Sequence, residues 1–564
     1  MRLTRKESLR KIASSGSSGD DPPVELGIDF GTTRTVVACS DRGNHPVVGF
    51  LDQAGDSVGW IPSVVAERGG DLRFGFDALG VSDDASYSTR RSFKRLLSGP
   101  DAGMRQSVRV GSTVIGVGEL VSRFLATVRT EIFARSDIRD SLGSESTPLR
   151  AAVAVPANAL GGQRFLTLDS FRRAGFEVTA MLNEPSAAGF EYTHRHRDTL
   201  SVKRDLVVVY DLGGGTFDAS IVRMSGRRHE VLATAGVSQL GGDDFDTALA
   251  GVVLSHVKLR LEDLTARSRD RLLDQCRSAK EALNPSSRKI TVDIEAVLGK
   301  DSPKPEVIIP VADFYDACMP LVDRSIEAMV PIMSRVDAVA DDMDTDVTLA
   351  SDIAGIYVVG GASELPIVAR ALRQRFGRRV HRSPYPSAAV AIGLSIAADV
   401  EAGFVLIDRY ARTFGVFREA SSGRAITFDS IFTPETELPS SGGSPHRCRR
   451  EYRAAHNLGH FRFFECSALD AGGQPRGDMS LFGDVYFPFD PRLGSNADLA
   501  SVPSNAARTT AVRASSKNTR SIPTASSMCA SVMSIRGTSA RSASARRDEA
   551  PEGLASWWLR YKET

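Results

Sequence analysis

The chain has 564 residues, which is too long for a single ordinary hydrophobic core, so we expect two or more domains. Hydrophobic residues make up 42% and charged residues 25% of it, a composition that excludes fibrous or wholly disordered proteins. Seventy basic residues against 69 acidic ones give a net charge of +1. This balance argues against a chain steered as a whole onto a specific nucleic acid or a membrane, so we expect neither partner.

Cysteine usage and the N-terminal segment indicate the compartment. The six cysteines are scattered without a CxxC pair, so a disulfide framework or a structural zinc site is not expected. Residues 1–23 are basic but lack the apolar region of a secretory signal, and they predict a flexible arm. A surface-binding role for this arm is the less favoured alternative. Together these features predict a cytoplasmic protein.

The region from residue 24 to about 400 alternates short apolar runs with longer amphipathic segments. Apolar runs that predict buried strands lie at residues 26–30, 151–155, 206–210 and 356–359. Helical periodicity lies at residues 117–134, 162–175, 243–262, 269–283, 311–336 and 364–377. Strands interleaved with helices predict a mixed α/β domain with helices covering a sheet, and the region is large enough for two lobes.

The last part of the chain has a different pattern. Residues 404–490 contain short apolar stretches separated by Ser, Gly and Pro turns, which predicts a small all-β unit. From about residue 494 the chain is rich in Ser, Ala and Arg, with no acidic residue between Asp498 and Asp548. Such a segment cannot bury enough apolar surface to offset its ordering entropy, so we expect a disordered tail. Binding of an anionic partner by this tail is the less favoured reading.

Two related glycine turns carry the chemistry. The first is residues 27–37 (GIDFGTTRTVV) and the second is residues 209–218 (VYDLGGGTFD). A Walker loop or a dinucleotide fingerprint passes from a strand into a helix, whereas here apolar, β-branched residues continue as a second strand. Each turn therefore predicts a β-hairpin whose tip exposes backbone N–H groups. Two ordinary hairpin turns are the alternative, which the matched flanks disfavour.

Glycines at these tips would let the main chain approach a polyanion closely, with their amides forming an anion nest. An Asp at the strand end would be repelled by phosphate unless Mg²⁺, which usually keeps most of its waters, lies between them. We therefore expect Asp29 and Asp211 to face each other across a cleft, one in each of two duplicated lobes. A third site, Gly360 and Gly361 between an apolar strand and a helix, suits a flat ligand such as adenosine.

On these residues the chain resembles the DnaK-type 70-kDa heat-shock chaperones, within the actin-like ATPase superfamily. Further blocks in family order are IPSVV (61–65), SFKRLL (92–97), AVAVPAN (152–158), GQRFLTLDSFRRAGF (162–176), LNEPSAAGFEY (182–192), LGGDDFD (240–246), SAKEALN (278–284), VVGGASELP (358–366) and PYPSAAVAIGLSIAA (384–398). The resemblance implies an α/β fold: a two-lobed, ribonuclease H-like ATPase domain, a small all-β domain and a disordered tail. The expected boundaries are 1–23 for the arm, 24–400 for the ATPase domain, 401–410 for the linker, 411–493 for the β-rich substrate-binding-like domain and 494–564 for the tail.

The resemblance implies an ATP/ADP site with Mg²⁺ between the lobes. Lys94 would orient the attacking water, Glu184 and Asp211 would position water and metal, and Thr216 would contact the γ-phosphate. Asp29 and Asp211 would hold Mg²⁺ through water. The implied ATP-binding residues are Gly31, Thr32, Thr33, Gly213, Gly214, Gly215, Gly241, Gly242, Lys280, Gly360 and Gly361. The implied interdomain coupling residues are Pro156, Arg164 and Pro185.

The adenosine half of the site departs from the family pattern. Arg277 stands where a Glu is common and Asn284 where a hydroxyl is usual, Ala362 and Glu364 replace Ser and Arg, and Ser387 replaces Asp. The phosphate half is intact, so the pattern predicts that Mg-ATP binding is retained and leaves the affinity open.

The implied function is that of an ATP-dependent chaperone whose β-domain clamps unfolded or extended polypeptide. A J-domain co-chaperone and a nucleotide-exchange factor would be its partners. Residues 405–410 match the family's apolar linker ending in Asp, whereas no helical lid is expected after the β-domain. Two alternatives remain open: a small-molecule kinase of the same superfamily, and a nucleotide-binding scaffold with little turnover.

Overall fold

The computed structural model describes most of the chain outside its two ends. The described residues are 24–98, 106–196, 199–299, 302–334, 352–399, 401–420, 425–438, 448, 456–488, 493 and 499–502. The expected N-terminal arm lies outside these residues, and so does all of the expected tail except residues 499–502.

The first lobe is built on a five-stranded sheet in the order β12-β11-β1-β2-β5. Its strands are β1 (Glu25–Phe30), β2 (Arg34–Cys39), β5 (Ile61–Pro62), β11 (Leu149–Val155) and β12 (Phe176–Asn183). β1 pairs antiparallel with β2 and parallel with β11, so a hairpin is joined to βαβ-type pairing. Helices α3 (Val117–Arg135) and α4 (Gly161–Arg173) belong to this lobe. The ring of Phe124 on α3 packs 5.6 Å from that of Phe30 at the end of β1.

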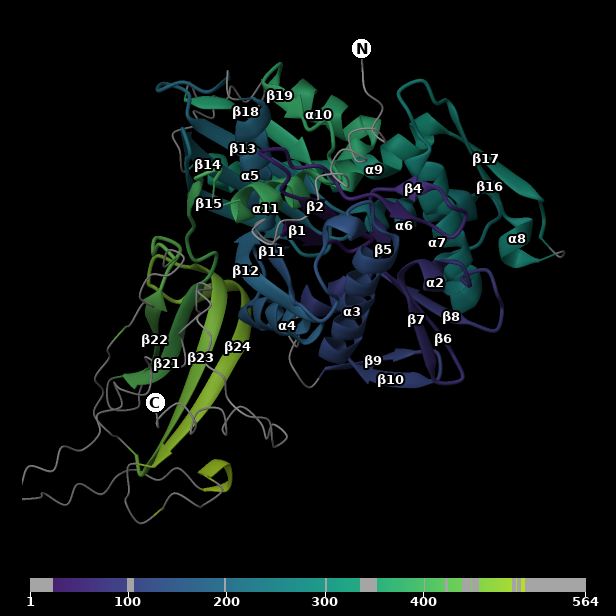
Figure 1. Cartoon of the computed structure of the whole chain (residues 1–564). Helices are drawn as coiled ribbons and strands as arrows, with labels where there is room; N and C mark the ends of the chain where they lie inside the picture. The colour runs from purple at the N-terminus through teal and green to yellow at the C-terminus, as the bar shows by residue number, and fades with distance from the viewer. Residues whose placement is uncertain are drawn as a thin grey trace, which may run out of the picture.

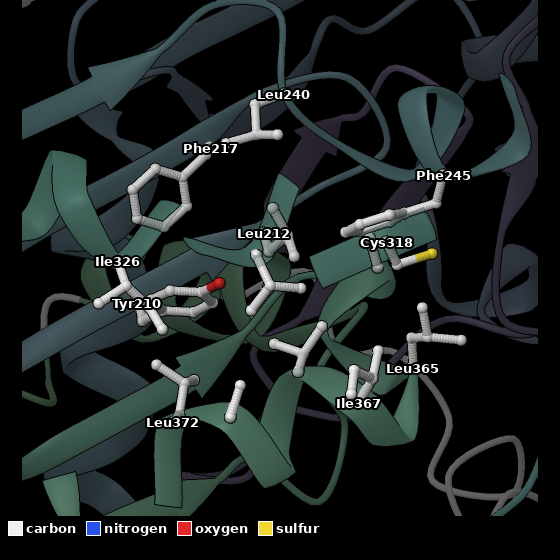
Figure 2. Packing of buried hydrophobic residues seen from close by; sticks show 14 of the residues in the cluster. Tyr210, Leu212, Phe217, Leu240, Phe245, Cys318, Ile326, Leu365, Ile367 and Leu372 are labelled. Atoms are coloured by element: carbon white, nitrogen blue, oxygen red, sulfur yellow. The ribbon is translucent and has the colours of Figure 1, made fainter. Parts of the chain in front are cut away.

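The second lobe repeats this plan with a six-stranded sheet in the order β19-β18-β13-β14-β15-β20. Its strands are β13 (Leu206–Leu212), β14 (Phe217–Ser225), β15 (Arg228–Val237), β18 (Ile353–Val359), β19 (Val380–Arg382) and β20 (Val405–Ile407). Its main helices are α6 (Gly242–Ser255), α7 (Ala266–Glu281), α9 (Val311–Ser334) and α10 (Pro366–Phe376). Figure 2 shows the core of this lobe, where Tyr210 and Phe217 lie with ring centroids 4.8 Å apart.

Two helices join the sheets: α5 (Glu184–Arg195) and α11 (Ala389–Ala398) (Figure 1). Their packing is so close that a Cβ added at Gly393 would lie 1.8 Å from the carbonyl oxygen of Ala187 on α5. A Cβ at Gly27 on β1 would lie 2.3 Å from the carbonyl oxygen of Ala391 on α11. These glycines are therefore required by the approach of neighbouring backbones.

Shorter elements decorate each lobe. In the first lobe they are β3 (Phe50–Leu51), β4 (Ser57–Val58), β6 (Val64–Arg68), β7 (Asp71–Phe74), α2 (Gly75–Leu79), β8 (Ser88–Arg91), the 3-10 turn η1 (Phe93–Ser98), β9 (Ser107–Val110), β10 (Thr113–Gly116) and η2 (Arg139–Ser141). In the second they are η4 (Leu261–Asp263), β16 (Lys289–Asp293), α8 (Glu295–Leu298), β17 (Glu306–Pro310) and η5 (Gly361–Glu364).

A separate antiparallel sheet follows, in the order β22-β21-β23-β24 (Figure 1). Its strands are β21 (Thr413–Ala420), β22 (Ala425–Phe432), β23 (Leu458–Leu469) and β24 (Pro475–Pro488). A small aromatic core stabilises it, in which the rings of Tyr410 and Phe432 stack 5.1 Å apart. We call β21–β24 the β-rich unit. After β24 the described residues contain one further helical turn, η7 (Leu499–Ser501).

The predicted fold class is confirmed: two α/β lobes precede a small β-sheet. The helix predicted over residues 243–262 ends earlier, at Ser255, because Lys258 takes the left-handed φ of 57° and ends the helical pattern. The helix predicted from residue 364 begins at Pro366, since the glycine pair leads first into η5. None of the described helices is both long and apolar enough to span a bilayer.

Candidate functional site

Both glycine turns are β-hairpin tips, as predicted. In the first, Asp29 pairs with Val36, and the Gly31 N–H donates to the Asp29 carbonyl at 3.0 Å. In the second, Asp211 pairs with Asp218, and the Gly213 N–H donates to the Thr216 carbonyl at 3.0 Å.

The two tips meet across the lobes. A Cβ added at Gly214 would lie 2.3 Å from the Thr33 hydroxyl oxygen, and one at Gly215 would lie 2.8 Å from Cγ2 of Thr32. The pKa of Asp211 is raised well above its usual value, most strongly by burial and then by Glu184, Asp218 and Asp29, so Asp29 lies close to Asp211. The hairpin tips of the two lobes therefore bring Asp29 and Asp211 close together, and their shared role in binding a ligand stays a prediction.

One lysine and four carboxylates converge beneath the tips. Lys94 of η1 is buried and forms an ion pair with Glu184 at 2.8 Å, where Glu184 is the first residue of α5. Burial raises the pKa of Asp29 and of Asp218 to about 7, with Glu184 adding to both shifts. Burial acts to lower the pKa of Lys94, but Glu184 and Asp29 outweigh it, so the net shift is upward.

This cluster has a surplus of negative charge. Asp29, Glu184, Asp211 and Asp218 share a single lysine, so a divalent cation with an anionic ligand would complete the charge balance. Within the described ranges no three His, Cys, Asp or Glu side chains converge tightly enough to hold a metal by themselves. The residues thus fit a hydrated Mg²⁺, which Asp29 and Asp211 would hold through water and which would neutralise phosphate charge.

Gly241 and Gly242 hold the second tip in place. The Gly242 N–H donates to the Gly213 carbonyl at 3.0 Å, and the Asp243 N–H donates to the Gly214 carbonyl at 2.8 Å. A Cβ at Gly241 would lie 2.6 Å from the Gly215 nitrogen. These two residues, predicted to bind ATP, thus pack directly against the second glycine turn.

The predicted adenosine residues gather around α7 and the start of α6. Lys280 donates to the Gly242 carbonyl at 2.7 Å and forms an ion pair with buried Asp246 at 2.6 Å. Arg277 contacts Asp243, Asp246 and Asp274, each at 3.2 Å. Gly360 takes a φ of 86° and packs against the second hairpin, where a Cβ would lie 2.4 Å from the Asp211 carboxylate. A Cβ at Gly361 would meet nothing nearer than Ser387, at 3.8 Å.

Three arginines outside the predicted site residues reach from the first lobe to the second. Arg95 donates to the Gly215 carbonyl at 2.9 Å and pairs with Asp244 at 2.6 Å. The pair Arg34–Glu281 measures 2.5 Å and the pair Arg91–Asp274 measures 2.6 Å. Arg34 belongs to the first glycine turn and Arg95 to the SFKRLL block. The partners of all three arginines lie about 120–250 residues away along the chain. Only the tertiary structure brings these pairs together.

The predicted coupling residues lie between this site and the linker. Pro185 follows Glu184 at the start of α5, and Pro156 follows β11. Arg164 on α4 donates to the Asn183 side chain, which in turn donates to Asp408 at 2.6 Å. Burial raises the pKa of Asp408 to about 6.

Paired hairpins at the junction of two α/β lobes define a class of nucleotide-binding protein, and the sequence comparisons specify the family. The model of the Hsp70 protein family matches residues 132–424, just over half of the chain. The chain therefore belongs to the Hsp70 family, and the resemblance drawn from its motifs is confirmed.

Curated relatives agree with this assignment. A chaperone protein HscA homolog from Aromatoleum aromaticum is 32% identical over 409 residues, which cover 70% of this chain and 61% of the relative. One from Burkholderia cenocepacia is 33% identical over 391 residues, covering 67% and 59%. One from a Janthinobacterium species is 31% identical over 420 residues, covering 70% and 62%. The chain thus spans about three fifths of the length of these relatives.

Proposed function

We propose that this chain is an ATP-dependent molecular chaperone that binds and hydrolyses Mg-ATP to control the binding of unfolded or extended polypeptide by its β-rich unit. The observation that carries the proposal is the buried cluster of Lys94 and four carboxylates beneath two touching glycine tips. Family membership and relatives named as chaperones support it.

In this proposal each group of the cluster has a separate role. Asp211 and Glu184 accept hydrogen bonds from the attacking water and orient it toward the γ-phosphate. Lys94 and the Thr216 hydroxyl stabilise charge on the γ-phosphoryl oxygens, which is the main contribution a protein makes to phosphoryl transfer. Mg²⁺, when bound, neutralises phosphate charge beside Asp29. Because Glu184 already holds Lys94 at 2.8 Å, the lysine is positioned before substrate arrives.

The adenosine end supports binding with a changed set of contacts. Arg277 and Lys280 are already engaged with Asp243, Asp246 and Asp274, so nucleotide would bind beside these ion pairs or exchange with them. Exchanging satisfied buried ion pairs for new contacts yields little net free energy. We infer modest affinity for ATP and ADP.

Coupling to the β-rich unit is supported by the contacts of the linker. Asp408 accepts from Asn183, which is adjacent to the proposed catalytic Glu184. Arg409 pairs with Glu230 of the second lobe at 2.8 Å. A change at Glu184 therefore has a short physical route to the linker. A J-domain co-chaperone and a nucleotide-exchange factor would act on this cycle.

The test is a steady-state ATPase assay with and without an apolar peptide. Lys94→Ala and Asp211→Ala should each lower turnover by about a hundredfold or more, because each removes charge stabilisation or water positioning. The exposed Lys304→Ala is the matched control and should behave as wild type. Absence of Mg-dependent turnover in the wild type, with nucleotide still bound, would favour the scaffold alternative. Turnover that peptide does not change would leave an ATPase without chaperone coupling.

A further inference from the structure

A cavity lies where both lobes meet the β-rich unit. It measures about 300 Å³, and its lining includes Thr216 and Asp218 from the second hairpin, Asn158 from the first lobe and Arg412, the residue directly before β21. The cavity therefore reaches the predicted γ-phosphate contact on one side and the docked β-sheet on the other.

Arg412 is almost completely buried in this junction, with 2% of its surface exposed. Its Nη1 donates to the Asn158 side-chain oxygen at 3.3 Å, and its Nη2 donates to the Asp478 carbonyl at 2.9 Å. Its Nε lies 3.6 Å from a carboxylate oxygen of Glu465. Arg412 thus touches the first lobe and two strands of the β-rich unit at once.

Glu465 completes the contact from the other side and is also 2% exposed. Its carboxylate accepts from the N–H of Gly161, the first residue of α4, at 2.9 and 3.1 Å. Phe482 of β24 packs so closely here that a Cβ on Gly161 would lie 2.5 Å from its ring. Burial raises the pKa of Glu465, while Arg412 opposes this shift.

These contacts form a continuous path from the second hairpin to the β-rich unit. The Asn158 N–H donates to the Asp218 carboxylate at 3.4 Å, and the Asn158 side chain accepts from Arg412. Arg412 pairs with Glu465, which accepts from Gly161. A change of charge or position at Asp218 therefore reaches the docking contact through three named side chains.

The energetics of a buried ion pair decide what this contact does. Removing two charges from water costs about as much as their attraction returns, so such a pair contributes little net stability. Removing one partner leaves an uncompensated buried charge and is strongly unfavourable. Replacing both by apolar side chains of similar volume is often stabilising.

We propose that Arg412 and Glu465 form a latch that fixes the docked position of the β-rich unit while keeping docking reversible, with Arg412 as a positioning residue. The inference rests on the proposed function only in taking docking of the β-rich unit to be a step of a nucleotide-driven cycle. The docked geometry itself does not require ATP hydrolysis.

Trypsin cleavage after Arg409 provides a direct test in the full-length chain. In the docked state this side chain is held by Glu230 and by the Glu435 carbonyl, at 2.8 and 2.6 Å, so cleavage reports release of the linker. Cleavage rates are measured by mass spectrometry without nucleotide, with ADP and with Mg-ATP, and are compared in the state that protects the wild type most.

Arg412→Met and Glu465→Leu alone should each raise the cleavage rate about tenfold or more, because each strands a buried charge. The double variant should regain the wild-type protection or exceed it, which a merely damaged fold would not do. Arg418→Met, in the strand β21 that follows Arg412 but 49% exposed, is the matched control. Unchanged cleavage in either single variant, or a double variant as accessible as the singles, would overturn the latch.

Parallel ATPase measurements separate this inference from the proposed function. If the wild type shows no ATP turnover but the double variant regains protection from trypsin, the latch is supported and the proposed ATPase activity is refuted. If the wild type hydrolyses ATP but the single variants keep the wild-type protection from trypsin, the proposed ATPase activity is supported and the latch is refuted.

Discussion

The most direct physical test of the carboxylate cluster is the pH dependence of stability in the absence of nucleotide. Asp218 is 3% exposed, and burial followed by Glu184 raises its pKa from 3.8 to about 7. The folded protein therefore binds this proton more tightly than the unfolded chain does. The stability that the proton contributes is complete below about pH 4 and is lost as the pH rises through about 7.

The magnitude follows from these two pKa values. One pKa unit corresponds to about 1.4 kcal/mol, so raising the pH from about 5.5 to about 7.5 should lower the free energy of unfolding by about 2 kcal/mol through Asp218 alone. Asp29 and Asp211 shift in the same direction and add to this loss.

Urea denaturation followed by circular dichroism at several pH values measures the effect. Asp218→Asn is isosteric and cannot ionise, so its pH dependence should be smaller than that of the wild type by about 2 kcal/mol. The exposed Asp71→Asn should keep the wild-type dependence. Saturating Mg-ATP should also flatten the curve, because a cation favours the charged carboxylates.

A wild type whose stability stays constant or rises over this pH interval would refute the reasoning. The same holds if Asp218→Asn keeps the full dependence, because the carboxyl would then not be the group that binds the proton.

Three further predictions concern contacts around the candidate site. Arg34→Ala removes a partly exposed ion pair between the lobes that is worth at most about 1 kcal/mol, so fluorescent ADP should dissociate up to about fivefold faster. High salt should abolish this difference, and the control variant Arg73→Ala should release ADP at the wild-type rate. Gly214→Ala adds a Cβ that clashes with the opposite tip, so the dissociation constant for ATP should rise about tenfold or more in calorimetry, whereas Gly251→Ala, with open space around it, should bind normally. Arg277→Glu restores the residue common in the family but adds a like charge to a cluster of aspartates, so it should weaken nucleotide binding and lower thermal stability by about 2 kcal/mol or more.

Each of these has a clear contradiction. Salt-independent release from the Arg34 variant would mean that the ion pair does not hold the lobes together. Normal ATP affinity in the Gly214 variant would mean that ATP does not bind at the paired tips. Tighter nucleotide binding by the Arg277 variant would mean that the aspartates contact the nucleotide and that Arg277 competes with it for them.

The sequence predicted those parts of the site that depend on local chemistry. A D-x-G turn followed by apolar, β-branched residues has few alternatives to a hairpin, so the geometry around Asp29 and Asp211 followed from short-range pattern. The all-β character of β21–β24 was predictable for the same reason. The catalytic and binding roles of these residues remain predictions.

What the sequence could not supply are contacts between distant segments. Arg95 stands beside Lys94 in the SFKRLL block, and only the fold places it on the Gly215 carbonyl. Arg277 appeared as a departure from the family, whereas its three aspartate partners explain how a cation is accommodated there. Arg412 and Glu465 carry no motif at all. Their meaning arises from burial, which depends on how the β-rich unit meets α4.

The seam between the lobes has a mechanical consequence. α5 and α11 approach most closely where Gly393 lies against the Ala187 carbonyl, and larger side chains such as Phe190 and Leu394 pack in the same buried cluster. At this point of closest approach, between a glycine and a carbonyl, no side chain has to change rotamer when one helix shifts slightly along the other. The spacing of α5 and α11 therefore depends on this one glycine. A bulky substitution at Gly393 would push the two helices apart at Ala187 without contacting either glycine turn.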